Sequence, residues 1–388
     1  ASAGNVEIDA GLAVTTNAAV GTALLPIGGT IDIGQNIEPT GTVDLNGTTI
    51  ATGAITVDGG DVTVDGAMDS QAGLVDLGAR RNIDINAATS ANTAVTFAAV
   101  DGDITIDAAV LSDTSTITGT AGRDILTGVG GTLTAQDVTN GAITLTAGRD
   151  VTLGDVVSAS EGVTVNADNN LAIDANVVAD FDTDATGDAI LNADVDSSSA
   201  GDVTMIAAAA VTGENVTVTG YNVQVDALTG DTRVTVTGQN DVQLNDAVTA
   251  TAENVLVTGG RNVAGAADGD IVAGGLVNVT GTLGNVTLDG SVTAQGTTAT
   301  LIAGGNLTTN DFVTAATDVT LTGGIDTNIN ETVTATAGNI DIEATDGAVT
   351  TGALGDLIAS AGNVEIDAGL AVTTNAAVGT AFLPIGGT

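Results

Sequence analysis

Hydrophobic and polar residues alternate along most of this chain in short runs. A typical run starts with Gly, Asn or Asp and continues with a branched aliphatic residue, a polar residue and a second aliphatic residue. Val, Ile and Thr suit a pleated, half-buried surface, so this two-residue period predicts strands with one buried face. Examples are GNVEI at 4–8, GTIDI at 29–33, GTVDL at 41–45, GDITI at 102–106, GAITL at 141–145 and GNVTL at 284–288.

No stretch of the chain shows the helical pattern of apolar residues three and four positions apart. Between the strand-like runs lie Gly, Asn and Asp, which favour turns. The chain is therefore predicted to be all-β.

The strand-like runs recur at a nearly constant spacing. Val62, Ile83, Ile104 and Ile125 follow one another at intervals of 21 residues. Other pairs that we take as equivalent are 20 or 21 residues apart: Leu74 and Val95, Ile143 and Val163, Val151 and Leu171, Val203 and Val223, Val234 and Val255, and Val242 and Val263.

A parallel β-solenoid with coils of about 20–21 residues explains this spacing, because each turn of chain then stacks its strands on those of the turn before. Inward residues would form aliphatic ladders, and outward Thr, Asp and Asn would meet water. Aromatic residues make up only 1% of the chain, which disfavours a globular sandwich core.

A much longer repeat encloses the short one. Residues 359–388 repeat residues 1–30 with one difference, Leu24 against Phe382. We therefore expect residues 1–358 to be one full solenoid repeat unit and residues 359–388 to be the start of the next, within a tandem array. One period would contain about 17 coils and advance roughly 80 Å at the usual strand spacing. Long arrays of this kind usually set length and presentation rather than perform chemistry.

Two segments break the strand rhythm, residues 12–30 and the Gly- and Ala-rich residues 266–283. The prolines, Pro26, Pro39 and Pro384, lie near the join of the long repeat. Because proline cannot donate in a strand ladder, we expect a protruding loop or a bend at this seam.

Charge excludes two classes of partner. The chain has no Lys, six Arg and 48 acidic residues, for a net charge of −42. Binding to nucleic acid or to an anionic membrane surface needs clustered basic residues. Hydrophobic residues make up 43% of the chain, so it is not a disordered acidic tail. The acidity fits a coat that keeps fibres from bundling, or adaptation to salt.

No transmembrane segment or signal peptide is expected. The longest nearly continuous apolar stretch runs from Met205 to Val211, and a spanning helix needs about twenty residues.

We expect no enzyme activity and assign no catalytic, cofactor-binding or metal-binding residue. The chain has no His and no Cys, which are the commonest general base and the usual thiol nucleophile. Gly-Arg-Asp phrases at Gly122–Asp124 and Gly148–Asp150 are interpreted as pairs between neighbouring Arg and Asp side chains at turns.

A calcium site is considered for the acidic stretch Ala179–Asp196. Asp182, Asp184, Gly187 and Asp188 resemble part of a Ca²⁺ loop, but Ala193 stands where a bidentate Glu is needed. The alternative, which we favour, is a solvated insertion between coils. Diffuse association of divalent cations with the whole acidic chain is expected before a specific site.

Fragments of the chain resemble the repeats of filamentous-haemagglutinin-type exoproteins. The recurring phrase is A-G-x-[DN]-[VL]-x-[LV], and it is carried by residues 145–173, 251–263 and 299–311. The resemblance implies a right-handed parallel β-helix. It also implies a large secreted or surface-anchored adhesin of a Gram-negative bacterium, although the secretion domain of that family is not found in this sequence.

From these observations we expect a structural repeat unit of an extracellular filament or stalk on the cell surface. One alternative is an adhesive module that contacts other cells through the seam loop or Ala179–Asp196. Another is lateral assembly into a sheath, fibre or surface layer. The partners would be copies of the chain itself, in tandem and side by side, or cell-surface ligands.

Overall fold

The computed structural model describes residues 4–10, 13–22, 25–34, 41–181, 186–195 and 201–379. All regular elements in these ranges are β-strands, and none of the ranges holds a helix able to cross a membrane. The strands stack in parallel, in about 17 coils of about 21 residues. This confirms the predicted all-β class and the β-solenoid. The contacts divide the chain into two compact units, residues 1–201 (unit 1) and residues 202–388 (unit 2), which are described separately.

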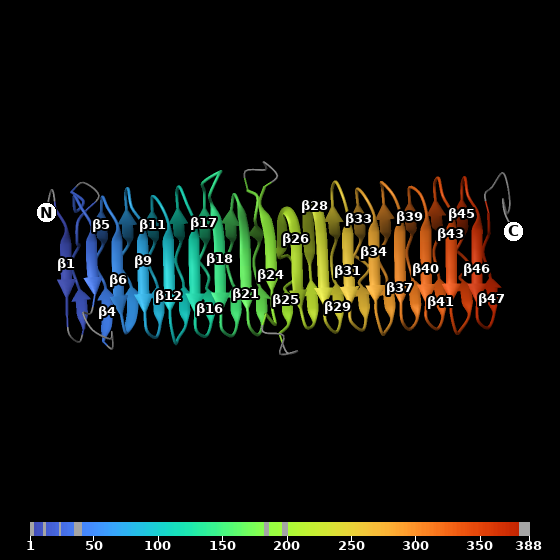
Figure 1. Ribbon diagram of the computed structural model, residues 1–388, viewed down its shortest axis with the longest axis horizontal. Coiled ribbons are helices and arrows are strands. Elements are labelled where there is room, and N and C mark those ends of the chain that lie inside the picture. The colour runs from blue at the N-terminus through green and yellow to red at the C-terminus, as the bar shows by residue number, and fades with distance from the viewer. Residues whose placement is uncertain are drawn as a thin grey trace. The chain divides into compact units, whose positions relative to one another are not determined.

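Unit 1 is built from three parallel ladders, because most coils contribute three short strands and equivalent strands pair from coil to coil (Figure 1). Ladder I contains β2 (Val14–Thr16), β4 (Thr42–Leu45), β7 (Asp61–Val64), β10 (Ile83–Ile85), β13 (Ile104–Ile106), β16 (Ile125–Thr127), β19 (Val151–Leu153) and β22 (Leu171–Ile173). Ladder II contains β5 (Thr49–Ala51), β8 (Met68–Ser70), β11 (Thr89–Ala91), β14 (Val110–Ser112), β17 (Leu133–Ala135), β20 (Val157–Ala159) and β23 (Val177–Val178). Ladder III contains β1 (Val6–Asp9), β3 (Ile31–Gly34), β6 (Ile55–Gly59), β9 (Val75–Ala79), β12 (Val95–Ala99), β15 (Ile117–Ala121), β18 (Ala142–Ala147), β21 (Gly162–Ala167) and β24 (Asp188–Asn192).

Unit 2 repeats the same three-ladder plan. Its ladder I contains β25 (Val203–Met205), β27 (Val223–Val225), β29 (Val242–Leu244), β32 (Val263–Gly265), β35 (Val286–Leu288), β38 (Leu307–Thr309), β41 (Thr327–Ile329), β44 (Val349–Thr351) and β47 (Val372–Thr374). The long strands β26 (Ala210–Gly220) and β28 (Ala227–Gly238) run through ladders II and III. Ladder II continues with β30 (Val248–Ala250), β33 (Ile271–Ala273), β36 (Val292–Ala294), β39 (Val313–Ala315), β42 (Val333–Ala335) and β45 (Leu357–Ala359). Ladder III continues with β31 (Val255–Gly259), β34 (Val277–Gly281), β37 (Ala299–Ala303), β40 (Val319–Gly323), β43 (Ile340–Ala344) and β46 (Val364–Ala368).

The core of each unit is a set of aliphatic columns inside the coils. Ile83 pairs with Val62 on one side and with Ile104 on the other, and all three side chains are fully buried. The polar residue between two inward aliphatics points outward, as Asp84 does between Ile83 and Ile85. Burying one such side chain stabilises the fold by about 1.5–3 kcal/mol, so repetition along the ladders supplies the stability.

The predicted register is confirmed at every pair tested except one. The pairs that begin at Val62, Ile83, Ile104, Ile143, Val151, Val203, Val234 and Val242 are Cα partners, as the spacing predicted. The equivalence of Leu74 with Val95 was wrong, because Val75 is the partner of Val95 and Leu74 is partly exposed. Where two aliphatic residues are adjacent, as Leu74 and Val75 are, the sequence does not show which of them points inward.

Two other predicted interruptions differ from the structure. Residues 266–283 contain β33 and β34, in which Ala273 and Gly281 occupy ladder positions. Small residues therefore fill the interior here without breaking the strands. The insertion predicted for Ala179–Asp196 is narrower than expected. Gly162 of β21 pairs with Asp188 of β24, so this coil is longer than its neighbours, but β24 lies inside the predicted stretch and its Ala189 and Leu191 are fully buried. This strand was missed because the polar residues Asp188 and Asn192 flank its inward aliphatic positions.

The interruption predicted for residues 12–30 is narrower than expected. This segment contains β2, and Val20 and Ile27 bridge to Thr49 and Ala51 of β5. Among the described residues, Thr22 and Leu25 instead form an antiparallel bridge with two backbone hydrogen bonds, and Leu25 is exposed. Pro26 follows Leu25, whereas Pro39, Pro384, Leu24 and Phe382 lie outside the described residues.

Candidate functional site

In each unit, a row of Asp and Asn side chains follows the outer edge of ladder I. Each residue of the row directly precedes the first inward aliphatic residue of a ladder I strand, where its side-chain oxygen can accept a hydrogen bond from the next coil. We call this row the Asx ladder. Its members are Asp61, Asn82, Asp103, Asp124, Asp150 and Asn170 in unit 1, and Asp202, Asn222, Asp241, Asn262, Asn285, Asn306 and Asp326 in unit 2.

In unit 1, one hydrogen bond repeats from coil to coil along the Asx ladder. The backbone N–H of Asn82 donates to Oδ1 of Asp61 at 3.2 Å, and that of Asp103 donates to Oδ1 of Asn82 at 3.1 Å. The same bond continues from Asp124, Asp150 and Asn170 at 3.0–3.2 Å. The row therefore satisfies backbone donors just before each strand starts.

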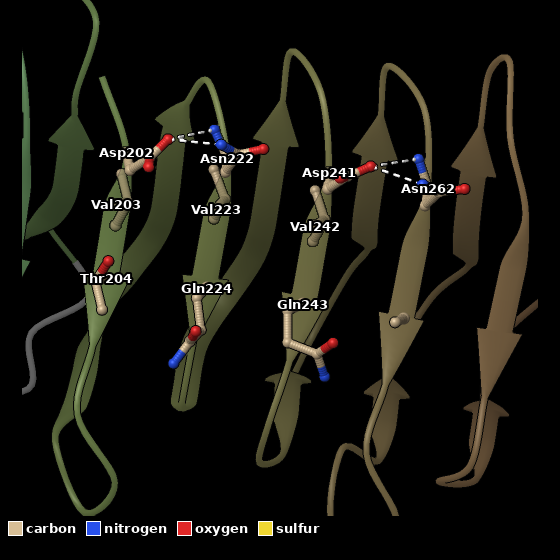
Figure 2. Close-up of a pocket in the computed structure, with 11 residues that line it drawn as sticks. Asp202, Val203, Thr204, Asn222, Val223, Gln224, Asp241, Val242, Gln243 and Asn262 are labelled. Carbon is tan, nitrogen blue, oxygen red and sulfur yellow. Dashed lines mark hydrogen bonds between the residues drawn. The ribbon is translucent and has the colours of Figure 1, made fainter. Parts of the chain in front are cut away.

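In unit 2, side-chain amides add a second contact to some of these bonds. Figure 2 shows that Oδ1 of Asp202 accepts from the backbone N–H of Asn222 at 3.1 Å and from its Nδ2 at 2.8 Å. Oδ1 of Asp241 accepts from the N–H and Nδ2 of Asn262 at the same two distances. Each such carboxylate therefore clamps the next coil through two donors.

Arginine side chains bind the carboxylates of this row from the following coil. Arg149 forms a two-point contact with Asp124, with Nε at 2.7 Å from Oδ1 and Nη2 on Oδ2. Arg81 binds Asp61, Arg123 binds Asp103 at 3.3 Å, and Arg261 binds Asp241 at 2.7 Å. The arginines thus offset the repulsion between carboxylates stacked one strand spacing apart.

The pKa values of these carboxyl groups follow their partners. The hydrogen bond from Arg81 holds the pKa of Asp61 below its usual range, and Arg149 does the same for Asp124. For Asp241, burial raises the pKa, but the hydrogen bonds from Arg261 and Asn262 outweigh it and the pKa is lowered. By contrast, burial raises the pKa of Asp84, which has no Arg partner among its pKa-shifting contacts. The carboxyl groups of Asp61, Asp124 and Asp241 are therefore ionised at neutral pH.

A groove lies on the outer face of ladder I in each unit. In unit 2 it has a volume of about 420 Å³, and its walls include the Asx ladder and the side chains of Thr204, Gln224 and Gln243 (Figure 2). In unit 1 a groove of about 280 Å³ is lined by Asp103, Asp124, Asp150, Thr105, Leu126 and Thr152 together with Ile104 and Ile125. Hydroxyl, amide and carboxylate groups converge there on a flat β face.

These grooves offer hydrogen bonding and negative charge. They suit a polar ligand or an extended chain with donor groups. Of the proposed calcium loop, Asp182 and Asp184 lie outside the described residues, and Asp188 belongs to β24. Within the described part of the chain, no three acidic side chains gather in a group that could hold a metal ion.

The Gly-Arg-Asp phrases were interpreted too locally. Arg123 binds Asp103 of the preceding coil, 20 positions earlier, not its neighbour Asp124. Arg149 contacts its neighbour Asp150 at 3.6 Å, but its two-point contact is with Asp124. Sequence reasoning also missed the Asx ladder, although its signal was present, since Asp or Asn recurs directly before the first aliphatic residue of successive runs.

Comparison with protein-family models, with curated proteins and with solved structures gives no significant match for this chain. Its function is therefore argued from the solenoid and its polar rows.

Proposed function

We propose that this chain is a structural repeat unit of an extracellular filament or stalk, in which the number of coils sets the reach of the protein. The observation that carries the proposal is the coil-by-coil register. Backbone hydrogen bonds, aliphatic columns and the Asx ladder all connect one coil to the next, so each coil adds one strand spacing of about 4.8 Å. Such a unit is a spacer whose length scales with its sequence.

The cell-surface location and the filamentous-haemagglutinin-like role rest on the repeat phrases and on the charge. The 388-residue chain has a net charge of −42, and an array would multiply the charge of each period. Like-charged fibres repel one another and stay soluble, which suits exposure to water outside a Gram-negative cell. In this proposal the chain performs no catalysis and needs no cofactor.

A second candidate function is adhesion through the ladder I grooves. The specific observation in its favour is the convergence of Thr204, Gln224 and Gln243 beside the carboxylates of Asp202 and Asp241. These grooves are a further place where a ligand would bind, beside the seam loop and the Ala179–Asp196 stretch.

Arrays of one, two and three periods distinguish the two functions. For a stiff spacer, the end-to-end distance measured by electron microscopy grows linearly, by roughly 80 Å per period. A flexible chain would grow only as the square root of its length, about 1.7-fold from one period to three. Growth of that kind would contradict the spacer.

Attachment to host cells or to sister cells is measured with the same three arrays on the bacterial surface. A spacer leaves the number of attached cells per molecule unchanged. An increase in proportion to the number of periods would assign adhesion to the repeats. The matched control is the three-period array with Gln224→Ala and Gln243→Ala in every period, which keeps the length and alters only the groove.

A further inference from the structure

The segment that occurs twice forms the same two strands in both places where both copies are described. β1 (Val6–Asp9) in unit 1 corresponds to β46 (Val364–Ala368) in unit 2, and β2 corresponds to β47. Gly21 and Gly379, which are equivalent residues, both have positive φ angles, of 81° and 116°. A change of neighbours has therefore not changed the fold of this coil.

The N-terminal copy shows what stacks on one side of this coil. β1 pairs with β3, so that Val6 is opposite Ile31 and Ile8 is opposite Ile33. The backbone N–H of Val6 donates to the carbonyl oxygen of Thr30 at 3.0 Å. In ladder I, β2 pairs with β4 with Val14 opposite Val43.

The C-terminal copy shows what stacks on the other side of the same coil. β46 pairs with β43, so that Val364 is opposite Ile340 and Ile366 is opposite Ile342. Here Ile340 donates its backbone N–H to the carbonyl oxygen of Asn363 at 2.9 Å. In both this bond and the bond from Val6 to Thr30, the N–H belongs to one coil and the carbonyl oxygen belongs to the coil that follows it.

One asparagine of the repeated segment forms a hydrogen bond to the preceding coil in one copy and to the following coil in the other. As Asn363 in the C-terminal copy, it donates its backbone N–H to Oδ1 of Asn339 at 2.9 Å. As Asn5 in the N-terminal copy, it accepts through its own Oδ1 from the N–H of Thr30 at 3.2 Å. The two bonds use different atoms of the residue, so one copy can make both at once.

A second asparagine repeats this division of contacts at the end of ladder I. As Asn375, it donates from Nδ2 to the carbonyl oxygen of Thr351 at 2.9 Å. As Asn17, it accepts through Oδ1 from Nδ2 of Asn46 at 3.1 Å. Both polar rows therefore have a donor for the preceding coil and an acceptor for the following one.

One valine of the repeated segment differs in exposure between the two copies, and the difference shows how much surface the following coil covers. Val14, which β4 covers, is 6% exposed, whereas the equivalent Val372 is 48% exposed. Val372 already packs on Val349 of β44. The outer side of the coil at residues 364–374 is thus an apolar and hydrogen-bonding surface whose complement is seen in the same protein.

We propose that this surface takes a second copy of the chain through the second copy's Ile31–Gly34 and Thr42–Leu45. The second copy's Ile31 stacks on Val364 and its Val43 on Val372, so that successive periods join in one continuous solenoid without a hinge. This inference rests on the proposed spacer function. It adds which residues pair where two periods meet, which the spacer function by itself does not specify.

Engineered disulfides test this register, because the natural chain has no cysteine. The test chain is residues 1–388 followed directly by residues 31–388, with Glu365→Cys and, in the second copy, Asp32→Cys. Paired Cα atoms on adjacent strands lie about 5 Å apart, within the span of a disulfide. Because Glu7 and Asp32 are paired in the single chain, Glu7→Cys with Asp32→Cys is the positive control.

The off-register control moves the second cysteine two residues along the strand, to the second copy's Gly34. This places the Cα atoms about 8 Å apart, beyond disulfide reach. The in-register pair is expected to oxidise to the same extent as the positive control, and the off-register pair at least tenfold less, by thiol counting and peptide mass. Equal oxidation of the two junction pairs, or none at the junction while the positive control oxidises, would overturn the continuous joint.

Hydrogen exchange gives a second reading that needs no substitution. The amides of Val364 and Ala368 correspond to those of Val6 and Ala10, which donate to Thr30 and Gly34 at 3.0 and 3.2 Å. Their exchange is expected to slow at least tenfold in the test chain relative to the 388-residue chain. Unchanged rates would contradict the joint, yet leave the spacer function intact if the length still grew linearly. Attachment that grew with the number of periods would instead reject the spacer while leaving the joint in place.

Discussion

Two stretches of the Asx ladder make the same backbone contact with different chemistry. In unit 1, Asp103, Asp124 and Asp150 follow one another, and Arg123 and Arg149 bind the first two carboxylates. In unit 2, three asparagines take the same places, Asn262, Asn285 and Asn306. We call these the Asp stretch and the Asn stretch.

The contact itself is nearly identical in the two stretches. In the Asp stretch, the N–H of Asp124 donates to Oδ1 of Asp103 at 3.1 Å. In the Asn stretch, the N–H of Asn306 donates to Oδ1 of Asn285 at 2.8 Å. The position thus requires a side-chain oxygen at the right distance from the backbone, and it tolerates charge where arginine offsets the repulsion.

Of the changes to the two stretches, loss of the side-chain oxygen is expected to lower the free energy of unfolding most. Asn285→Ala removes the acceptor of the Asn306 N–H, and it should lower the free energy of unfolding by about 1–2 kcal/mol, since an unsatisfied backbone donor keeps its desolvation cost. The measurement is the midpoint of chemical denaturation followed by circular dichroism.

Asn285→Asp is the matched control for that substitution. It keeps Oδ1 in place and adds only a charge, so its effect should stay below about 0.5 kcal/mol. If the Ala and Asp variants lost the same stability, charge or side-chain polarity rather than the acceptor would govern the position.

Removal of an arginine is expected to have a smaller effect, confined to the Asp stretch. Arg149→Gln removes the two-point contact with Asp124 and the contact with Asp150. At low salt it should cost more stability than the loss of a fully exposed ion pair, because the Asp124 side chain is only 26% exposed. In 1 M salt the loss should shrink, because screening weakens repulsion between the carboxylates.

Arg233→Gln serves as its comparison. Arg233 contacts Glu253 at 3.4 Å, and the Glu253 side chain is 51% exposed. The expected loss is a few tenths of a kcal/mol, typical of an exposed pair. Equal losses for Arg149→Gln and Arg233→Gln would show that the Asp stretch gains nothing from the placement of its arginines.

The smallest expected effect is a change in the response to acid. Arg149 lowers the pKa of Asp124 in the folded chain, so the contribution of this carboxylate is present above the unfolded pKa, near 3.9, and is lost as the pH falls through the folded pKa. The stability difference between the natural chain and Asp124→Asn should therefore narrow from pH 5 to pH 2. A difference that stayed constant over this range would mean that Asp124 does not contribute through its charge.

Much of the ladder register was predicted from the sequence, because inward positions alternate with outward ones and are mostly aliphatic. The 21-residue steps from Val62 to Ile125 are confirmed for this reason. Where composition misled, the failures have one cause. Leu74 has an aliphatic neighbour that occupies the inward position. β24, β33 and β34 have Asp, Ala or Gly in positions where only pairing with the neighbouring coils reveals a strand.

The candidate site was predicted less well, for a related reason. Its members lie about 20 residues apart in sequence and meet only when the coils stack. Asn82 and Asp103 were assigned to turns and to solvent, and the arginines to their sequence neighbours. The distance between Arg123 and Asp103 depends on the length of a whole coil, which local patterns do not reveal.

The sequence by itself determined the class of fold, the length of a coil, the excess of negative charge and the 358-residue period, because each is a property of residue types and their spacing. Only the tertiary structure decided which residues of neighbouring coils touch. Asn5 and Asn363 are equivalent positions of the repeated segment, yet the side chain of Asn5 accepts a hydrogen bond whereas the backbone N–H of Asn363 donates one. The neighbouring coil alone makes that difference, since hydrogen bonds between coils join residues that are distant in the chain.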